Sequence, residues 1–153
     1  MTTGAADHIY TLHRTPFAMA PLLHAFHDEA EVKENGILLS YLILPLLLYP
    51  PMQAFLKGAN KRSTLRTMCD DHRRLIGLDV RVQEFKSLTN SALQILLTEK
   101  RVAMGEGMAL TSISQIHEKS ARADLLKMSK KLAAIFADIE VVSIYRTLGL
   151  KSL

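Results

Sequence analysis

The strongest constraint on the fold is one nearly uninterrupted apolar stretch, Ile37 to Met52, which reads ILLSYLILPLLLYPPM. A helix that crosses a bilayer needs about 20 such residues, and this stretch is shorter. Because the stretch has no polar face, we expect a helix buried all round in a protein core, with no membrane partner. Proline removes a backbone donor, so we expect Pro45 to kink or end the helix and Pro50-Pro51 to close it.

The length of the chain predicts one domain around this stretch. A chain of 153 residues can bury a sizeable core without disulfides or metals. The single cysteine, Cys69, forms no internal disulfide, which indicates a reducing compartment, and we expect the cytoplasm. Residues 1–14 lack the basic start and apolar run of a signal peptide, so we expect a flexible lead before a single domain at residues 15–153.

Helical periodicity surrounds the core stretch. Thr15-Pro16 is a typical helix start, with an apolar face that recurs every three or four residues until Asn35-Gly36 ends the helix. Further helices are predicted from the cap Ser63 to the stop Gly77, from Leu78 to Leu88, from Ser91 to Glu99 after a break at Thr89-Asn90, and from Ser120 to Asp138. A last short helix opens at Asp138 or Glu140 and stops at Gly149.

The pattern changes between the predicted helices Ser91–Glu99 and Ser120–Asp138. Residues 101–104 and 108–111 flank the loop Gly105-Glu106-Gly107, which indicates a β-hairpin near residues 101–111. Helix, hairpin and helix is the order of a winged-helix unit. The sequence therefore predicts a compact, mainly α-helical fold with one β-hairpin and a winged-helix-like middle part.

No residue pattern indicates catalysis, a cofactor or a metal. His24 and His27 stand one helical turn apart and could hold a metal, but no further ligand pair accompanies them, so we interpret them as part of a solvated face. His72 lies in an apolar stripe and is interpreted as a core or boundary residue. Cys69 lies on the same stripe and is interpreted as a small apolar side chain. Gly105-Glu106-Gly107 lacks the lysine of a phosphate-binding loop.

The charges divide unevenly along the chain. Residues 1–55 hold five acidic and two basic residues, whereas residues 56–153 hold ten acidic and seventeen basic ones. This asymmetry suits either an acidic or nucleic-acid partner or a plain solvated surface. The proposed contacts are sequence-nonspecific, with the backbone of double-stranded DNA. Six residues are candidates: Lys57, Lys61, Arg62, Arg66, Lys100 and Arg101.

Four segments resemble a known family, the middle component of bacterial three-component ABC systems. They read TPFAMAPLLHAF (Thr15–Phe26), GILLSYLILPLLLYPP (Gly36–Pro51), KRSTLRTM (Lys61–Met68) and IYRTLGLKS (Ile144–Ser152). Together they cover the chain in order from residue 15, and they are mostly hydrophobic. After the Leu-Pro block, relatives often carry a basic residue, whereas this chain continues with Tyr49-Pro50-Pro51-Met52-Gln53.

The resemblance implies a partner role. Such a subunit is not an enzyme and links an SMC/Rad50-like coiled-coil ATPase to an effector, commonly a nuclease, in anti-phage or anti-plasmid defence of the Lamassu type. Two alternatives from other classes remain. A free-standing winged-helix transcriptional regulator would be a homodimer with a polar recognition helix, but Ser91–Glu99 is rich in leucine. A metal-dependent enzyme would be built on His24 and His27.

Overall fold

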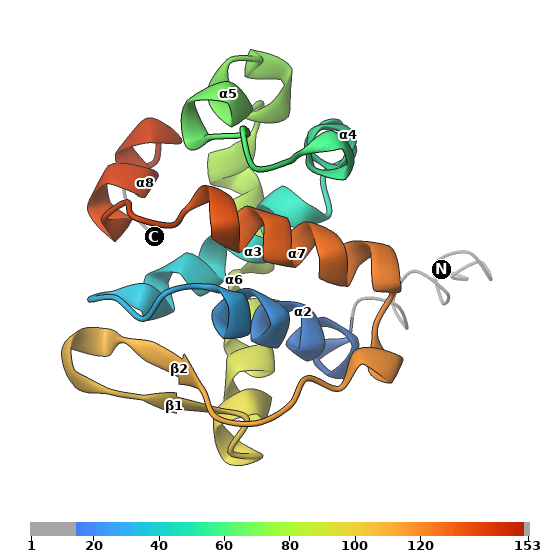
Figure 1. Cartoon of the computed structure of the whole chain (residues 1–153), viewed down its shortest axis with the longest axis vertical. Coiled ribbons are helices and arrows are strands. Elements are labelled where there is room, and N and C mark those ends of the chain that lie inside the picture. The colour runs from blue at the N-terminus through green and yellow to red at the C-terminus, as the bar shows by residue number, and fades with distance from the viewer. Residues whose placement is uncertain (1–14, 152–153) are drawn as a thin grey trace, which may run out of the picture.

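The computed structural model describes residues 15–151 and has a mainly helical fold with one β-hairpin (Figure 1), as predicted. The predicted flexible lead, residues 1–14, lies outside the described residues. The elements follow in this order: α2 (Pro16–Glu29), η1 (Gly36–Leu39), α3 (Ser40–Leu47), α4 (Pro50–Gly58), α5 (Leu65–Cys69), η2 (His72–Arg74), α6 (Leu78–Thr98), β1 (Val102–Met104), η3 (Glu106–Met108), β2 (Leu110–Ser112), η4 (Glu118–Ser120), α7 (Ala123–Ile135) and α8 (Val141–Thr147).

Helix α2 runs through the centre of the fold and packs against α3, α6, α7 and β2. It begins as predicted, because Thr15 caps it by accepting a hydrogen bond from the Ala18 amide at 3.2 Å, with Pro16 in the first turn. The predicted single apolar face is wrong, since every residue from 19 to 27 is buried. The helix also ends at Glu29, before the predicted stop, where Ala30 turns to an extended conformation.

The apolar stretch forms the buried helix α3, in which Leu42 to Leu47 are all buried. Pro45 lies inside α3, and the helix ends two residues later at Leu47. Pro50-Pro51 does not close the stretch but begins α4, where the missing proline donors leave no helical bond unmade. In the described residues no single helix is long and apolar enough to cross a membrane. Within residues 15–151, one pair of helical segments, Gly36–Leu47 and Pro50–Gly58, reaches that length together, and it is bent by 101°.

Arg81 of α6 fastens the end of α3. Its Nε donates a hydrogen bond to the Pro45 carbonyl oxygen at 3.2 Å, and its guanidinium lies 3.6 Å from the centre of the Tyr49 ring. The last carbonyl groups of a helix have no partner inside the helix, so this contact supplies one. A cation over an aromatic ring adds attraction.

The segment from 63 to 77 differs from its prediction. Thr64, not Ser63, caps α5 by accepting from the Thr67 amide at 3.2 Å, and α5 ends at Cys69. His72 is exposed rather than at a core boundary, because the helix has ended and η2 turns it outward. Gly77 has a φ of 68°, a conformation that favours glycine, and it begins α6 rather than ending the helix before it.

Helix α6 is continuous from Leu78 to Thr98, so the predicted break at Thr89-Asn90 is wrong. Thr89 is fully buried in the helix, and Asn90 accepts a hydrogen bond from the Tyr41 hydroxyl at 2.5 Å. Packing against α2 and α3 therefore overrides the weak local preference of these two residues. Ser91–Glu99 is the last part of a long helix and not a separate one.

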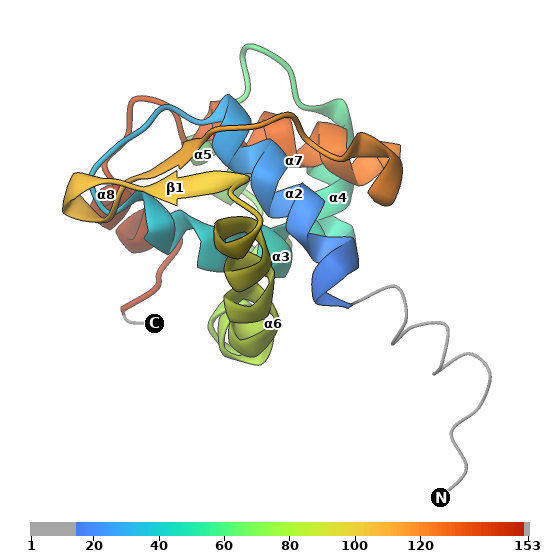
Figure 2. The ribbon, with the colours of Figure 1, turned by 90° about the horizontal axis from the view of Figure 1, so that it is seen from below.

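The predicted hairpin is confirmed. Strands β1 and β2 pair antiparallel with Ala103 opposite Thr111, and Gly107 at the turn has a φ of 64°. The Gly107 carbonyl accepts a hydrogen bond from the Asn35 amide at 2.7 Å, which ties the turn to the segment after α2. Figure 2 shows the hairpin beside α2 at one edge of the molecule.

The last two helices close the core. α7 is shorter than the predicted Ser120–Asp138, but its apolar side is buried as predicted. Glu140 is the N-cap position of α8 and Gly149, with a φ of 78°, follows its end. The Lys33 ammonium donates to the carbonyl oxygens of Phe136 at 2.9 Å and Ile139 at 2.7 Å, which fixes the turn between α7 and α8.

Candidate functional site

The two helix-α2 histidines are buried, so their interpretation as a solvated face is wrong. His24 is 1% exposed and His27 is 5% exposed. The His27 Nε2 lies 2.7 Å from the Ser40 hydroxyl oxygen of α3, and its ring meets Phe26 edge to face at 5.2 Å. Burial, and then the charge of His24, lower the pKa of His27 to about 4, so the buried ring is neutral at pH 7.

His24 belongs to a chain of hydrogen bonds between α2 and β2. Its Nε2 lies 2.9 Å from the Ser112 hydroxyl oxygen, and that hydroxyl donates to the Asp28 carboxylate at 2.8 Å. Burial lowers the pKa of His24, and the neighbouring charge of Asp28 opposes that change. In a serine hydrolase the histidine takes the serine proton and the carboxylate holds the histidine. Here the serine lies between the other two and its hydroxyl donates a hydrogen bond to the carboxylate, so the group holds a strand against a helix.

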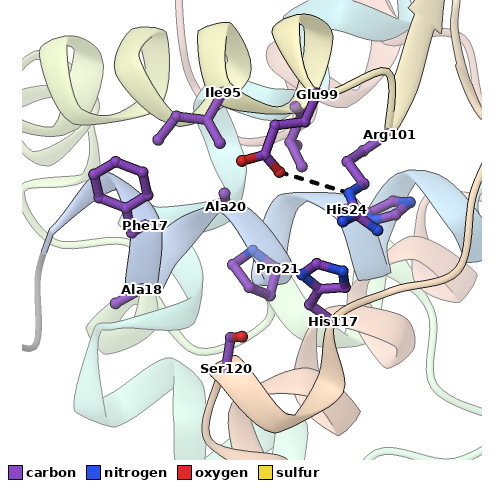
Figure 3. A pocket seen from close by; sticks show the side chains of 11 residues that line it. Phe17, Ala18, Ala20, Pro21, His24, Ile95, Glu99, Arg101, His117 and Ser120 are labelled. Carbon is purple, nitrogen blue, oxygen red and sulfur yellow. Dashed lines mark ion pairs between the residues drawn. The ribbon is translucent and has the colours of Figure 1, made fainter.

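A pocket of about 310 Å³ lies beside these hydrogen bonds of His24, between the first turns of α2, the end of α6 and the η4 segment (Figure 3). Phe17, Pro21 and Ile95 line its apolar part, and Arg101 and His117 line its polar part. The Arg101 guanidinium is 3.6 Å from the Glu99 carboxylate and also donates to the Gln115 carbonyl at 3.3 Å. Both contacts are long. The pocket is thus lined both by an aromatic ring that is 72% exposed, Phe17, and by the guanidinium of Arg101, which these two long contacts hold weakly.

No metal site can be built from the described residues. Across residues 15–151, no three or more His, Cys, Asp or Glu side chains gather closely enough to hold an ion. Cys69 is half-buried, and burial raises the pKa of its thiol, which opposes the thiolate that a nucleophile or metal ligand needs. The exposed His72 lies three residues on from Cys69, in the turn that follows α5.

The six candidate cations fall into two groups at opposite ends of the molecule (Figure 1). Four are exposed around α4 and α5, and we call them the α4–α5 cations: Lys57, Lys61, Arg62 and Arg66. Two lie between α6 and β1, and we call them the hairpin cations: Lys100, which is exposed, and Arg101, which is half-buried. The structure therefore does not join all six into one surface.

Two lysines of α7 extend the α4–α5 group, and the sequence reasoning did not assign them to it. Lys130 and Lys131 line a hollow of about 310 Å³ together with Lys61 and Asn60. The Lys131 ammonium donates to the Lys57 carbonyl oxygen at 2.9 Å, so its charge sits at the end of α4. In the sequence, the positions of Lys130 and Lys131 show only that both avoid the apolar side of an amphipathic helix. The packing of α7 against α4 decides which part of the surface they reach.

Exposed apolar side chains also went unrecognised in the sequence. Val80 of α6 is 56% exposed and Val142 of α8 is 58% exposed, with hollows of the surface beside both. Valine is common in cores, so the residue type alone does not tell an exposed valine from a buried one.

Comparison with known proteins identifies a family. The family model described as ABC-three component (ABC-3C) system Middle Component 3 matches residues 3–152. No curated protein and no solved structure matches the chain.

Proposed function

The chain belongs to the family of ABC-three component system Middle Component 3, and from this membership we propose that it is a non-catalytic subunit that links the other components of its system. The partners are an SMC/Rad50-like coiled-coil ABC ATPase and an effector, a nuclease, that act in the cytoplasm against phage or plasmid DNA in the manner of Lamassu defence. The family match over nearly the whole chain is the observation that carries this proposal.

The chemistry of the described side chains supports binding rather than catalysis. Several polar groups inside the fold hold elements together: His24 and Ser112 tie β2 to α2, His27 and Ser40 tie α2 to α3, and Ser129 donates to a carbonyl of α2 at 2.7 Å. The surface, by contrast, carries apolar side chains that are more than half exposed, such as Val80 and Val142, and larger patches of exposed apolar surface mark protein-binding sites.

Co-expression with the ATPase and effector of the same system tests the linking role. We expect a complex that contains all three chains by native mass spectrometry, and separate purification of ATPase and effector when this chain is left out. If ATPase and effector stay associated and equally active without it, the linking role is wrong. A homodimer of this chain that ignores both partners and binds a specific DNA sequence would favour the winged-helix regulator instead.

A direct contact with the DNA backbone is part of the proposal, and the α4–α5 cations are its first candidates because four exposed charges and two neighbouring lysines share one end of the molecule. Each phosphate contact contributes about 0.9 to the slope of log affinity against log salt. Replacing the four α4–α5 cations with alanine should therefore lower that slope by about 2 to 4. Replacing the two hairpin cations gives the comparison, and unchanged slopes in both variants would exclude the contact.

A further inference from the structure

We propose that a hollow between helix α7 and the loop that joins α4 to α5 binds a phosphate group of the backbone of double-stranded DNA. The hollow has a volume of about 310 Å³, and we call it the lysine hollow. This inference rests on the proposed contact with DNA, and it adds the place and the side chains that hold one phosphate. The charged and polar lining of the hollow consists of Glu29, Asn60, Lys61, Ser63, Lys130 and Lys131.

The lining of the lysine hollow carries an excess of positive charge. Lys61, Lys130 and Lys131 contribute three ammonium groups, against the single carboxylate of Glu29. Among residues 15–151, the Lys61 ammonium makes no ion pair within 4.0 Å. Charges of one sign around a concave surface raise the local concentration of ions of the opposite sign, so the hollow favours a negatively charged ligand.

Lys131 provides a charge that is already fixed in position. Its ammonium donates hydrogen bonds to the carbonyl oxygens of Leu56 at 3.1 Å and Lys57 at 2.9 Å, both in the last turn of α4. An ammonium group has three N–H donors, so these two bonds leave one donor for a ligand. The neutral carbonyls orient the ammonium and keep its charge, so binding an anion costs little further ordering of this side chain.

Asn60 and Ser63 add neutral donors to the lysine hollow. The Ser63 hydroxyl oxygen accepts from the Asn60 backbone amide at 2.9 Å, and the Asn60 side-chain oxygen accepts from the Arg62 amide at 2.8 Å. Across residues 15–151, no hydrogen bond uses the Ser63 O–H or the Asn60 side-chain amino group as its donor. Lysine, serine and asparagine are among the side chains that proteins use to contact DNA phosphates, so the lining matches this ligand.

The surroundings of the lysine hollow favour a phosphate of a DNA chain over a free anion. The other α4–α5 cations, Lys57, Arg62 and Arg66, are exposed and lie at the same end of the molecule (Figure 1). A free phosphate would occupy the hollow alone and leave these charges without a ligand. A DNA duplex carries one negative charge per about 1.7 Å of its axis, so a duplex held at the hollow brings further phosphates toward them.

Two carboxylates oppose a bound phosphate, and they make the proposal testable by a gain of affinity. Glu29 lines the hollow and, among residues 15–151, makes no ion pair within 4.0 Å. The Glu118 carboxylate of η4 lies 3.7 Å from the Lys130 ammonium, and 67% of the Glu118 side chain is exposed. A long and exposed ion pair contributes little to stability, so a phosphate can replace Glu118 as the partner of Lys130.

Binding of a short labelled DNA duplex, followed by fluorescence anisotropy at several salt concentrations, tests the site. K61Q/K130Q should weaken the affinity roughly tenfold in about 0.1 M salt and lower the slope of log affinity against log salt by about 1, the value for one phosphate. The matched control K86Q/K151Q removes two lysines outside the lysine hollow and should bind within about twofold of the unaltered chain. Circular dichroism checks that both variants fold.

The carboxylate variants test the site from the opposite direction. E29Q and E118Q should each bind the duplex about threefold more tightly than the unaltered chain, because each removes a charge that opposes the phosphate. The gain from E118Q should vanish in the K61Q/K130Q background, where its partner Lys130 is gone. The control E106Q removes an exposed carboxylate in the hairpin turn and should give no gain.

The outcomes separate the hollow from the wider DNA contact. If the unaltered chain binds no DNA, the proposed DNA contact fails and the lysine hollow fails with it. If the chain binds DNA and K61Q/K130Q binds equally well, or E118Q gives the same gain in both backgrounds, only the hollow is wrong. Inorganic phosphate at constant ionic strength should not displace the duplex at concentrations comparable with the DNA; displacement there would assign the hollow to a free anion and overturn the proposal.

Discussion

Acidification from pH 7.5 to 5 should destabilise the fold mainly through one buried side chain, His27. Its ring is 5% exposed, its Nε2 lies 2.7 Å from the Ser40 hydroxyl, and its pKa is lowered to about 4 from an ordinary value of 6.5. The unfolded chain therefore takes up this proton more readily than the folded chain between these two values. The stabilisation is complete above pH 6.5 and is lost as the pH falls toward 4.

The size of the effect follows from the difference between the two pKa values. A pKa difference of about 2.5 corresponds to ~3.4 kcal/mol when the loss is complete. At pH 5 the same values give a loss of ~2 kcal/mol relative to pH 7.5. The window stops at pH 5 because the carboxylates with lowered pKa, Glu31, Asp71 and Asp124, lose their contributions only at lower pH, below the ordinary carboxyl pKa of about 4.

Urea denaturation at several pH values, followed by circular dichroism, measures the free energy of unfolding directly. The variant His27→Gln keeps a polar group facing Ser40 but cannot be protonated, so it should be less stable at pH 7.5 by ~1–2 kcal/mol and lose much less between pH 7.5 and 5. The remaining loss belongs to His24, whose pKa burial also lowers. The exposed His72 gives the control His72→Gln, which should show the pH dependence of the unaltered chain. An identical loss in His27→Gln would refute the reasoning.

Three further predictions concern stability and are checked by chemical denaturation at pH 7.5. Thr89→Val should be neutral or stabilising by up to ~1 kcal/mol, because the buried Thr89 hydroxyl has no hydrogen-bond partner; a loss above 1 kcal/mol would reveal one. Leu44→Ala should cost ~2–5 kcal/mol, since Leu44 is 0% exposed, and a smaller cost would mean that the core closes around the gap. Gly149→Ala should cost ~1 kcal/mol because its φ is 78°, whereas Gly58→Ala, at a helical position with free space, should stabilise by ~0.5 kcal/mol; equal effects would contradict the backbone argument.

Local signals in the sequence predict the elements whose geometry is decided within a few residues. Thr15-Pro16 begins α2 because a hydroxyl cap and a fixed φ act inside one turn. Gly105 to Gly107 predicts the hairpin because few residues adopt the conformation of its turn, and Gly149 follows α8 for the same reason. These predictions do not depend on what the elements pack against.

Signals that are ambiguous without tertiary contacts led to the wrong boundaries. Gly77 has the conformation that ends many helices, but here the same conformation precedes α6. Pro50-Pro51 can close one helix or open the next. The structure decides between the two, because the chain bends by 101° before α4 begins at Pro50. Thr89 is a weak helix former that a continuous helix tolerates because it is buried within the core.

The same limit explains the error at the histidines. His24 and His27 have the one-turn spacing of a polar face, and their residue type favours the surface. Their hydrogen-bond partners, Ser112 and Ser40, lie 88 and 13 residues away, so no local pattern shows that the rings can be buried without losing a polar contact. A buried histidine needs such a partner, and only the fold supplies it.

The exposure of a side chain, like its burial, is decided by the fold, and this matters for the surface that a linking subunit would use. Val80 and Val142 are of a residue type that is common in cores, and Asp79 and Arg146 are ordinary helix-end charges. Each residue taken alone has a sufficient structural explanation in the sequence. Only the assembled fold shows that Val80 and Val142 are more than half exposed beside hollows of the surface, which folding alone does not require. For a protein that works by binding, the informative observation is therefore a side chain that the fold leaves uncovered, and such a side chain becomes visible only after the core has been assembled.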